Sequence, residues 1–105
     1  MTAKAATAQF IPSGINEANH FVVKVTCPAL TSSDTLDVTL PTGCPADALP
    51  VGPPVCYSLS SDTYTKDTDI GDVTTHNRAT GVTRITPTGN VAAGSVLLLH
   101  YMGHG

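Results

Sequence analysis

The chain has 105 residues, of which only 12% are charged, and its formal net charge at pH 7 is −3. This length is that of one domain, and the five Lys and Arg are too scattered for the basic surface that nucleic-acid binding needs. No apolar run approaches the ~20 residues of a membrane-spanning helix. We therefore expect neither nucleic acid nor a membrane as partner.

The low charge also bears on how the surface is covered. The charged share is about half of the roughly 25% that globular domains usually carry, so the surface is poorly protected against association. This favours a chain that becomes covered by copies of itself or by a partner. The first ten residues lack the apolar stretch of a secretory signal, so we expect synthesis in the cytoplasm.

The N-terminal segment, residues 1–15, is rich in small side chains. It is expected to form an extended arm, followed by a single domain over residues 16–105. An arm of this kind can add a strand to an exposed sheet edge of a neighbour. Phe10 and Ile11, near its end, are candidate contact residues.

Period-two alternation predicts strands along most of the remaining chain. In residues 19–27, for example, Phe21, Val23 and Val25 face one side and Lys24 the other. In residues 55–60 the apolar face carries Val55, Tyr57 and Leu59. Similar patterns occupy residues 34–40, 72–76, 82–86 and 95–102. Short strands separated by turn signals predict an all-β fold, a single-domain β-sandwich or small β-barrel.

A proline-rich segment, residues 41–54, links two of these strands and holds five of the eight prolines. Connections of this length in compact domains tend to be functional or disordered. Because the prolines stiffen it, we expect an ordered loop that contacts a partner. Pro50 and Val51 are its candidate contact residues.

The acidic stretch, residues 60–72, contains Asp62, Asp67, Asp69 and Asp72. Closely spaced carboxylates can bind calcium, but the stretch lacks the liganding side chains of an EF-hand loop. A solvated acidic turn is the favoured interpretation, and a calcium site of another type stays open.

The last predicted strand, residues 95–102, is apolar on both faces. Leu97, Leu99 and Tyr101 point one way, while Val96, Leu98 and Met102 point the other. The strand is either central in its sheet with both sides packed, or it turns one face to another subunit. We take Leu97, Leu99 and Tyr101 as its candidate interface residues.

No group of residues predicts catalysis. The G-x-S-x-G pattern of a nucleophile elbow is missing, and the three cysteines do not have the spacing of a zinc site. We expect no enzyme activity, no cofactor and no metal. Three reduced thiols are the favoured state, with a disulfide between Cys44 and Cys56 as the alternative. Tyr57, Tyr64 and Tyr101 are candidates for a sugar-binding surface.

A resemblance extends over residues 74–103, TTHNRATGVTRITPTGNVAAGSVLLLHYMG. This segment resembles the closing strands of small all-β head decoration (cement) proteins of tailed bacteriophages. The resemblance implies a non-enzymatic protein on the capsid exterior of the virion. Its partner would be the major capsid protein, and it would be a homo-oligomer, with a trimer favoured. The alternative function is a carbohydrate- or surface-binding module of a phage fibre or adhesin.

Overall fold

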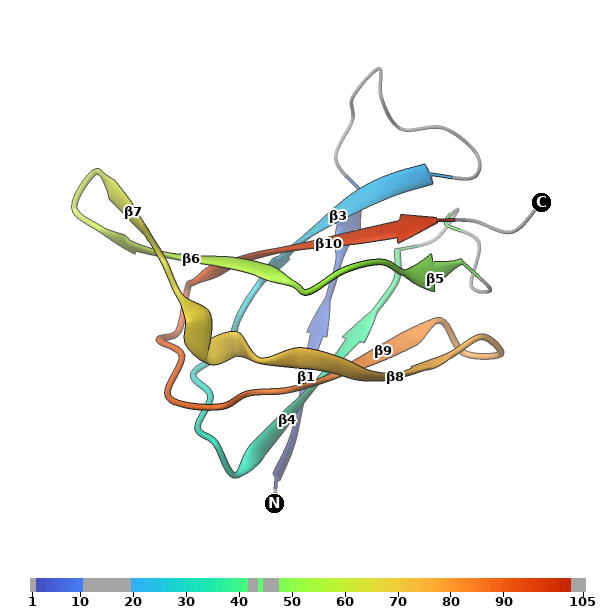
Figure 1. Cartoon of the computed structure of the whole chain (residues 1–105), viewed down its shortest axis with the longest axis horizontal. Helices are drawn as coiled ribbons and strands as arrows, with labels where there is room; N and C mark the ends of the chain where they lie inside the picture. The colour runs from blue at the N-terminus through green and yellow to red at the C-terminus, as the bar shows by residue number, and fades with distance from the viewer. Residues whose placement is uncertain (1, 11–19, 42–43, 45–47, 103–105) are drawn as a thin grey trace.

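The computed structural model describes residues 2–10, 20–41, 44 and 48–102 and places them in two facing β-sheets (Figure 1). The predicted all-β sandwich is therefore confirmed. The strands are β1 (Thr2–Thr7), β2 (Gln9–Phe10), β3 (His20–Thr26), β4 (Asp34–Thr39), β5 (Leu49–Pro50), β6 (Val55–Ser60), β7 (Thr63–Lys66), β8 (Asp72–Asn77), β9 (Val82–Thr86) and β10 (Val96–Met102). A short 3-10 helix, η1 (Thr68–Ile70), lies between β7 and β8.

The four-stranded sheet has the order β1-β4-β9-β8, and the six-stranded sheet has the order β2-β3-β10-β6-β7, with β5 also paired to β10. All neighbours are antiparallel except β1 and β4, which run parallel. The alternating segments of the sequence became β3, β4, β6, β8, β9 and β10. The short strands β2, β5 and β7, and the small-residue strand β1, carry too little alternation to be predicted.

The core lies between the sheets and follows the predicted alternation in β3 and β4. Phe21, Val23 and Val25 of β3 are all 2% exposed or less, whereas Lys24 is exposed. Burying apolar surface of this kind contributes about 25 cal/mol per Å², which is the main stabilising term of the fold. The other buried apolar residues of the cluster are Ala8, Cys27, Leu30, Leu36, Val38, Leu40, Ala48, Cys56, Ile70, Ile85, Val91, Leu97, Leu99 and Tyr101.

The terminal strand β10 is central in the six-stranded sheet. All seven of its residues pair with β3 on one side, and β6 and β5 pair with it on the other. The strand is therefore central in its sheet, but the expectation that both of its faces are packed is wrong, because Val96 and Leu98 on its outer face are half-buried and Met102 is 53% exposed. A strand with neighbours on both sides does not fray, because its backbone groups are bonded along both edges.

The candidate interface residues of β10 need a correction. Leu97, Leu99 and Tyr101 are 0%, 2% and 0% exposed and point into the core. They contact their own chain and offer no surface to another. The outer side of β10 carries Val96, Leu98 and Met102 instead, because successive side chains in a strand point to opposite faces.

Residues 2–10 of the expected arm belong to the sandwich. They form β1 in one sheet and β2 in the other, and Ala8, at the crossing point, is 1% exposed. Lys4 holds β1 in place: its Nζ donates to the Ala29 carbonyl at 2.9 Å and lies 3.6 Å from an Asp34 carboxylate oxygen. Residues 1 and 11–15 of the expected arm lie outside the described residues.

A chain of polar groups crosses the core and joins the two sheets. The Tyr101 hydroxyl of β10 lies 2.6 Å from the Thr83 hydroxyl of β9, which lies 2.7 Å from His76 Nδ1 of β8. The Tyr101 ring also stacks on Phe21, with a centroid distance of 5.2 Å. A buried hydroxyl without a partner costs about 1–3 kcal/mol, so this network sets how the two sheets face each other.

We expect Tyr101→Phe to lower the free energy of unfolding by about 1 kcal/mol, because it removes the hydrogen bond to Thr83 and keeps the ring. Urea unfolding measures the change. Tyr64→Phe is the matched control, because the Tyr64 side chain is exposed, and it should change stability by less than about 0.5 kcal/mol. Equal effects of the two variants would contradict a structural role for the network.

Candidate interaction surface

Strand β6 turns its larger apolar side chains away from the core. Cys56 is 1% exposed and pairs with Leu97, whereas Val55, Tyr57 and Leu59 lie on the outer side. The alternation predicted for this strand is present, but the predicted apolar face points outward. The register decides the direction, because Cys56 lies opposite a β10 residue that points into the core.

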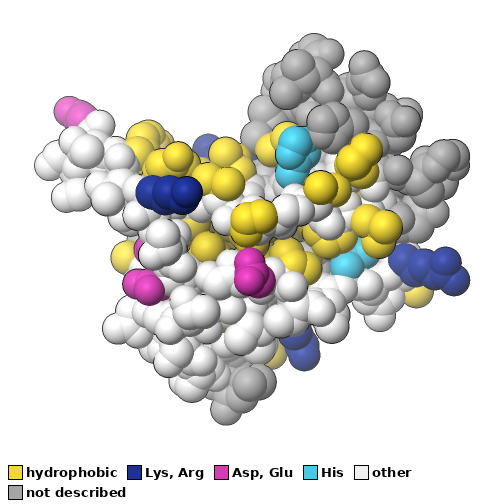
Figure 2. Space-filling view, viewed as in Figure 1, with side chains coloured by type: hydrophobic (Ala, Val, Ile, Leu, Met, Phe, Trp, Pro, Cys, Tyr) yellow, Lys and Arg dark blue, Asp and Glu magenta, His cyan; other side chains and the backbone are white. Residues whose placement is uncertain are grey.

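The outer side of the six-stranded sheet is apolar over several neighbouring strands. Leu59, Tyr64, Met102 and Leu49 are 53%, 58%, 53% and 66% exposed. Figure 2 shows hydrophobic side chains gathered in a band over β6, β5 and β10. Large exposed apolar patches mark interaction sites. We call this surface the apolar face; it consists of Leu49, Val55, Tyr57, Leu59, Tyr64, Val96, Leu98 and Met102.

A shallow hollow lies within the apolar face. It has a volume of about 290 Å³ and is lined by Tyr57, Tyr64, Val96 and Leu98. The two tyrosine rings meet edge to face, with a centroid distance of 6.4 Å and an interplanar angle of 82°. This is one of the preferred arrangements of aromatic pairs, so the two rings hold each other in place as walls of the hollow.

The β6–β7 hairpin carries one end of the apolar face. It extends beyond the rest of the sandwich (Figure 1), and its strands place Leu59 directly opposite Tyr64. Ser61, at the tip, adopts a φ of 54°, which a tight turn between two strands requires. A projecting hairpin with two exposed apolar side chains is suited to insertion into a complementary surface.

Two lysines border the apolar face. Lys24 of β3 lies opposite Leu98 of β10, and Lys66 of β7 lies opposite Tyr57 of β6. Both lysines are exposed. A partner that matches this surface therefore has an apolar centre with acidic groups at its border.

The remaining predicted contact residues lie in different places. Phe10 pairs through its backbone with Val23, and Ile11 lies outside the described residues. Pro50 pairs with Tyr101 at the end of β10 and is half-buried. Val51 is 42% exposed, and its N–H donates to the His100 carbonyl at 2.8 Å. Pro50 and Val51 thus adjoin the apolar face at Leu49. The residues that line its hollow were not among the contact residues predicted from the sequence.

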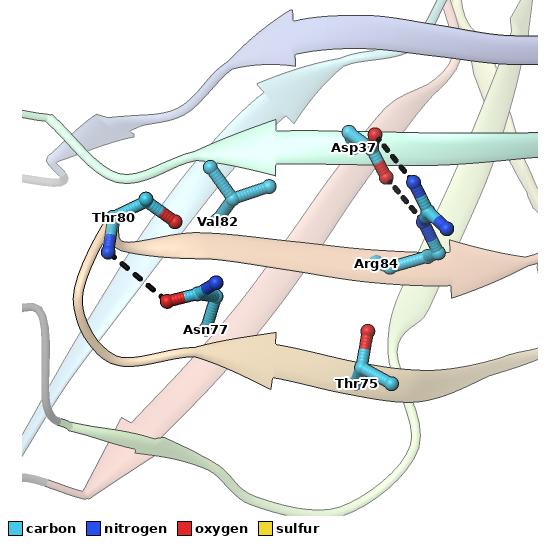
Figure 3. A pocket seen from close by; sticks show the side chains of 6 residues that line it. All are labelled: Asp37, Thr75, Asn77, Thr80, Val82 and Arg84. Atoms are coloured by element: carbon cyan, nitrogen blue, oxygen red, sulfur yellow. Dashed lines mark hydrogen bonds and ion pairs between the residues drawn. The ribbon is translucent and has the colours of Figure 1, made fainter.

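The four-stranded sheet carries a polar pocket of about 350 Å³ on its surface (Figure 3). Arg84 Nε and Nη2 donate to the two Asp37 carboxylate oxygens at 2.8 and 3.0 Å. The side-chain hydrogen bond from Arg84 lowers the pKa of Asp37. Asn77 Oδ1 accepts from the Ala79 and Thr80 backbone N–H groups and so stabilises the β8–β9 turn. These polar groups satisfy one another, so the pocket is explained by cross-strand pairing and turn formation.

The acidic stretch forms β7 and η1 in place of a simple turn. Asp67 Oδ1 accepts from the Asp69 N–H at 2.9 Å and caps the 3-10 helix. Gly71 follows with a φ of 76°, and a side chain there would collide with the Thr86 carbonyl. Within the described part of the chain, no three His, Cys, Asp or Glu side chains are grouped in a way that could hold a metal ion.

The three cysteines are free thiols. Cys27 and Cys56 are buried beside each other, and the hydrogen bond that the Cys27 thiol donates to Cys56, together with burial, raises the pKa of Cys27. Burial also raises the pKa of Cys44. Cys27 and Cys44 therefore stay protonated at neutral pH, and Cys27 and Cys56 act as small core residues.

We expect Arg84→Gln to raise the pKa of Asp37 towards its ordinary value of 3.8, measured by NMR titration of the carboxyl carbon. A depressed pKa stabilises the fold above pH 3.8, and this contribution is lost as the pH falls. The variant should therefore lose less stability on acidification than the unmodified chain. Arg78→Gln, in the exposed β8–β9 turn, is the control and should leave Asp37 unchanged. The same shift in both variants would contradict a specific pair.

Comparisons with known proteins give no independent indication of function. The chain matches no known protein-family model, no curated protein and no solved structure. The described residues also contain no helix that is both long and apolar enough to cross a membrane. The surface of the chain is therefore the remaining source of functional information. The main feature of the described surface is the apolar face of the six-stranded sheet.

Proposed function

We propose that the chain is a non-enzymatic structural protein that binds the exterior of an assembled bacteriophage capsid and stabilises it. The single observation that carries this proposal is the apolar face, with four side chains more than half exposed. An apolar surface of this kind on a chain with 12% charged residues suits a permanent contact with another protein.

The proposed mechanism is stabilisation of the assembled shell by binding across neighbouring capsid subunits. A protein that binds only the assembled shell lowers the free energy of that state, and separating the capsid subunits then also requires its release. The Leu59–Tyr64 end of the apolar face would insert between neighbouring capsid subunits, because it projects from the sandwich on the β6–β7 hairpin. Lys24 and Lys66 would pair with acidic groups of the major capsid protein at the border of the contact.

The resemblance of residues 74–103 to decoration proteins supports the same proposal, and it adds an expected copy number of three around a local symmetry axis. The apolar face is long enough to serve both the shell and a neighbouring copy, since it runs from β7 across β6 and β10 to β5. The proposed location is the outer surface of the virion.

A second candidate function is carbohydrate binding, as in a module of a phage fibre or adhesin. The observation that favours it is the hollow between Tyr57 and Tyr64, because ligand pockets are commonly walled by aromatic side chains. Tyr101, the third tyrosine considered for this role, is buried and takes no part.

The decisive experiment is cosedimentation with phage heads that lack this protein, purified from the phage whose genome encodes the chain. We expect Leu59→Asp and Tyr64→Asp each to weaken binding at least tenfold, because a central apolar contact is worth about 1.4 kcal/mol or more. Thr65→Asp is the matched control, since Thr65 lies on the opposite side of the same hairpin and is exposed.

The outcomes separate the two functions. Unmodified chain that does not sediment with the heads would refute the capsid proposal. Binding to a glycan array, lost in Tyr64→Asp and kept in Thr65→Asp, would establish the carbohydrate function in its place. Full binding by both Leu59→Asp and Tyr64→Asp would show that the apolar face is not the contact surface.

A further inference from the structure

The free edge of β1 is the longest regular edge that the described strands leave unpaired. Strand β1 borders the four-stranded sheet and pairs only with β4, in one continuous register over all six residues. At the other border of this sheet, the register of β8 shifts between Val73 and Thr75. Such a bulge is a usual protection of an edge against further pairing, and β1 has none.

The one charged side chain of β1, that of Lys4, points towards its own chain and so does not protect the edge. Lys4 is the single charged residue of the strand, and it bonds to the Ala29 carbonyl and lies beside Asp34. The strand also contains no proline. Edge strands are normally protected by prolines, bulges or free lysines, so β1 lacks all three usual devices.

The parallel register shows which backbone groups face outward. The Ala8 N–H donates to the Thr39 carbonyl, so the even-numbered residues direct their backbone groups to β4. Ala3, Ala5 and Thr7 therefore direct their N–H and C=O groups to the free edge. Their side chains are exposed and small, and they leave room for another strand to approach.

We propose that this edge binds a second copy of the chain, with the two β1 strands antiparallel about a two-fold axis through Ala5. In this register Ala5 lies opposite Ala5 of the second copy, and Ala3 lies opposite Thr7. Antiparallel residues that face each other through their bonding groups exchange two hydrogen bonds, so the three pairs form six. The result is one continuous sheet across both copies.

The two neighbouring registers, with the axis centred on Lys4 or on Ala6, form fewer hydrogen bonds. Centring the axis on Lys4 keeps only four of these bonds and places two lysines directly opposite each other, which is unfavourable. Centring it on Ala6 also keeps only four, because a further pair would need Gln9, which already pairs with Lys24 in the other sheet. In the register centred on Ala5, each Lys4 lies opposite an Ala6. The edge is thus complementary to itself in one register.

The second copy is favoured over a chain of copies because the other border of the sheet is bulged. Pairing of β1 with β8 of a neighbour would repeat without end, whereas pairing of β1 with β1 closes after two copies. A contact along one strand is small, so the dimer should dissociate on dilution. This pairing does not use the apolar face, so it can fail while the capsid contact holds. The three copies expected around a shell axis concern the bound state, whereas the β1 pairing concerns the free chain in solution.

The test is the mass of the full chain by light scattering over a dilution series, in reducing buffer because the chain has free thiols. We expect a concentration-dependent rise from 10.8 kDa to twice that value. Ala5→Lys and Ala5→Glu should each raise the dissociation constant at least tenfold, because like charges then face each other across the axis. An equal mixture of the two variants should restore the dimer.

Ala79→Lys, in the exposed β8–β9 turn, is the control for added charge and should still form dimers. Circular dichroism checks that the Ala5 variants keep the fold, since the backbone groups of Ala5 do not bond to β4. A chain that stays monomeric at every concentration would overturn the proposal. So would a mass of three times 10.8 kDa, or a dimer that Ala5→Lys and Ala5→Glu leave intact.

Discussion

The structure depends on the central position of β10. Because β3 pairs along one of its edges and β6 and β5 pair along the other, this C-terminal strand joins segments from the first quarter and the middle of the chain into one sheet. Leu97, Leu99 and Tyr101 then form the middle of the core. The same pairing places Val96 and Leu98 on the outer side, so the apolar face is a direct consequence of how the core is built.

The two sheets are oriented by a polar connection as well as by apolar packing. Apolar side chains tolerate many relative positions, whereas the hydrogen bonds from Tyr101 to Thr83 and on to His76 require one. Within the four-stranded sheet, the register of β4 and β9 places Asp37 directly opposite Arg84, so the two side chains pair on its outer side (Figure 3). The polar pocket there is thus a product of the sheet register.

Two surfaces formed by the described residues are suited to contact with another chain. One is the apolar face, which gains free energy when a partner buries it. The other is the β1 edge, whose backbone groups exchange hydrogen bonds to water for hydrogen bonds to another strand when one is added. The two surfaces differ in chemistry and lie on different sheets, so one chain can contact a shell through the first and a second copy through the second.

The sequence by itself determined the all-β class and six of the strands. Period-two alternation is a local property, because successive side chains of a strand point to opposite faces. It also showed that β10 is apolar on both faces. The tertiary structure alone decided which face is inside: Leu97 and Cys56 face the core because β6 and β10 pair in that register. It also decided that β1 joins the sandwich, since its small residues carry no alternation and owe their place to β4. Interaction surfaces depend on such pairings between distant segments, and no local pattern encodes them.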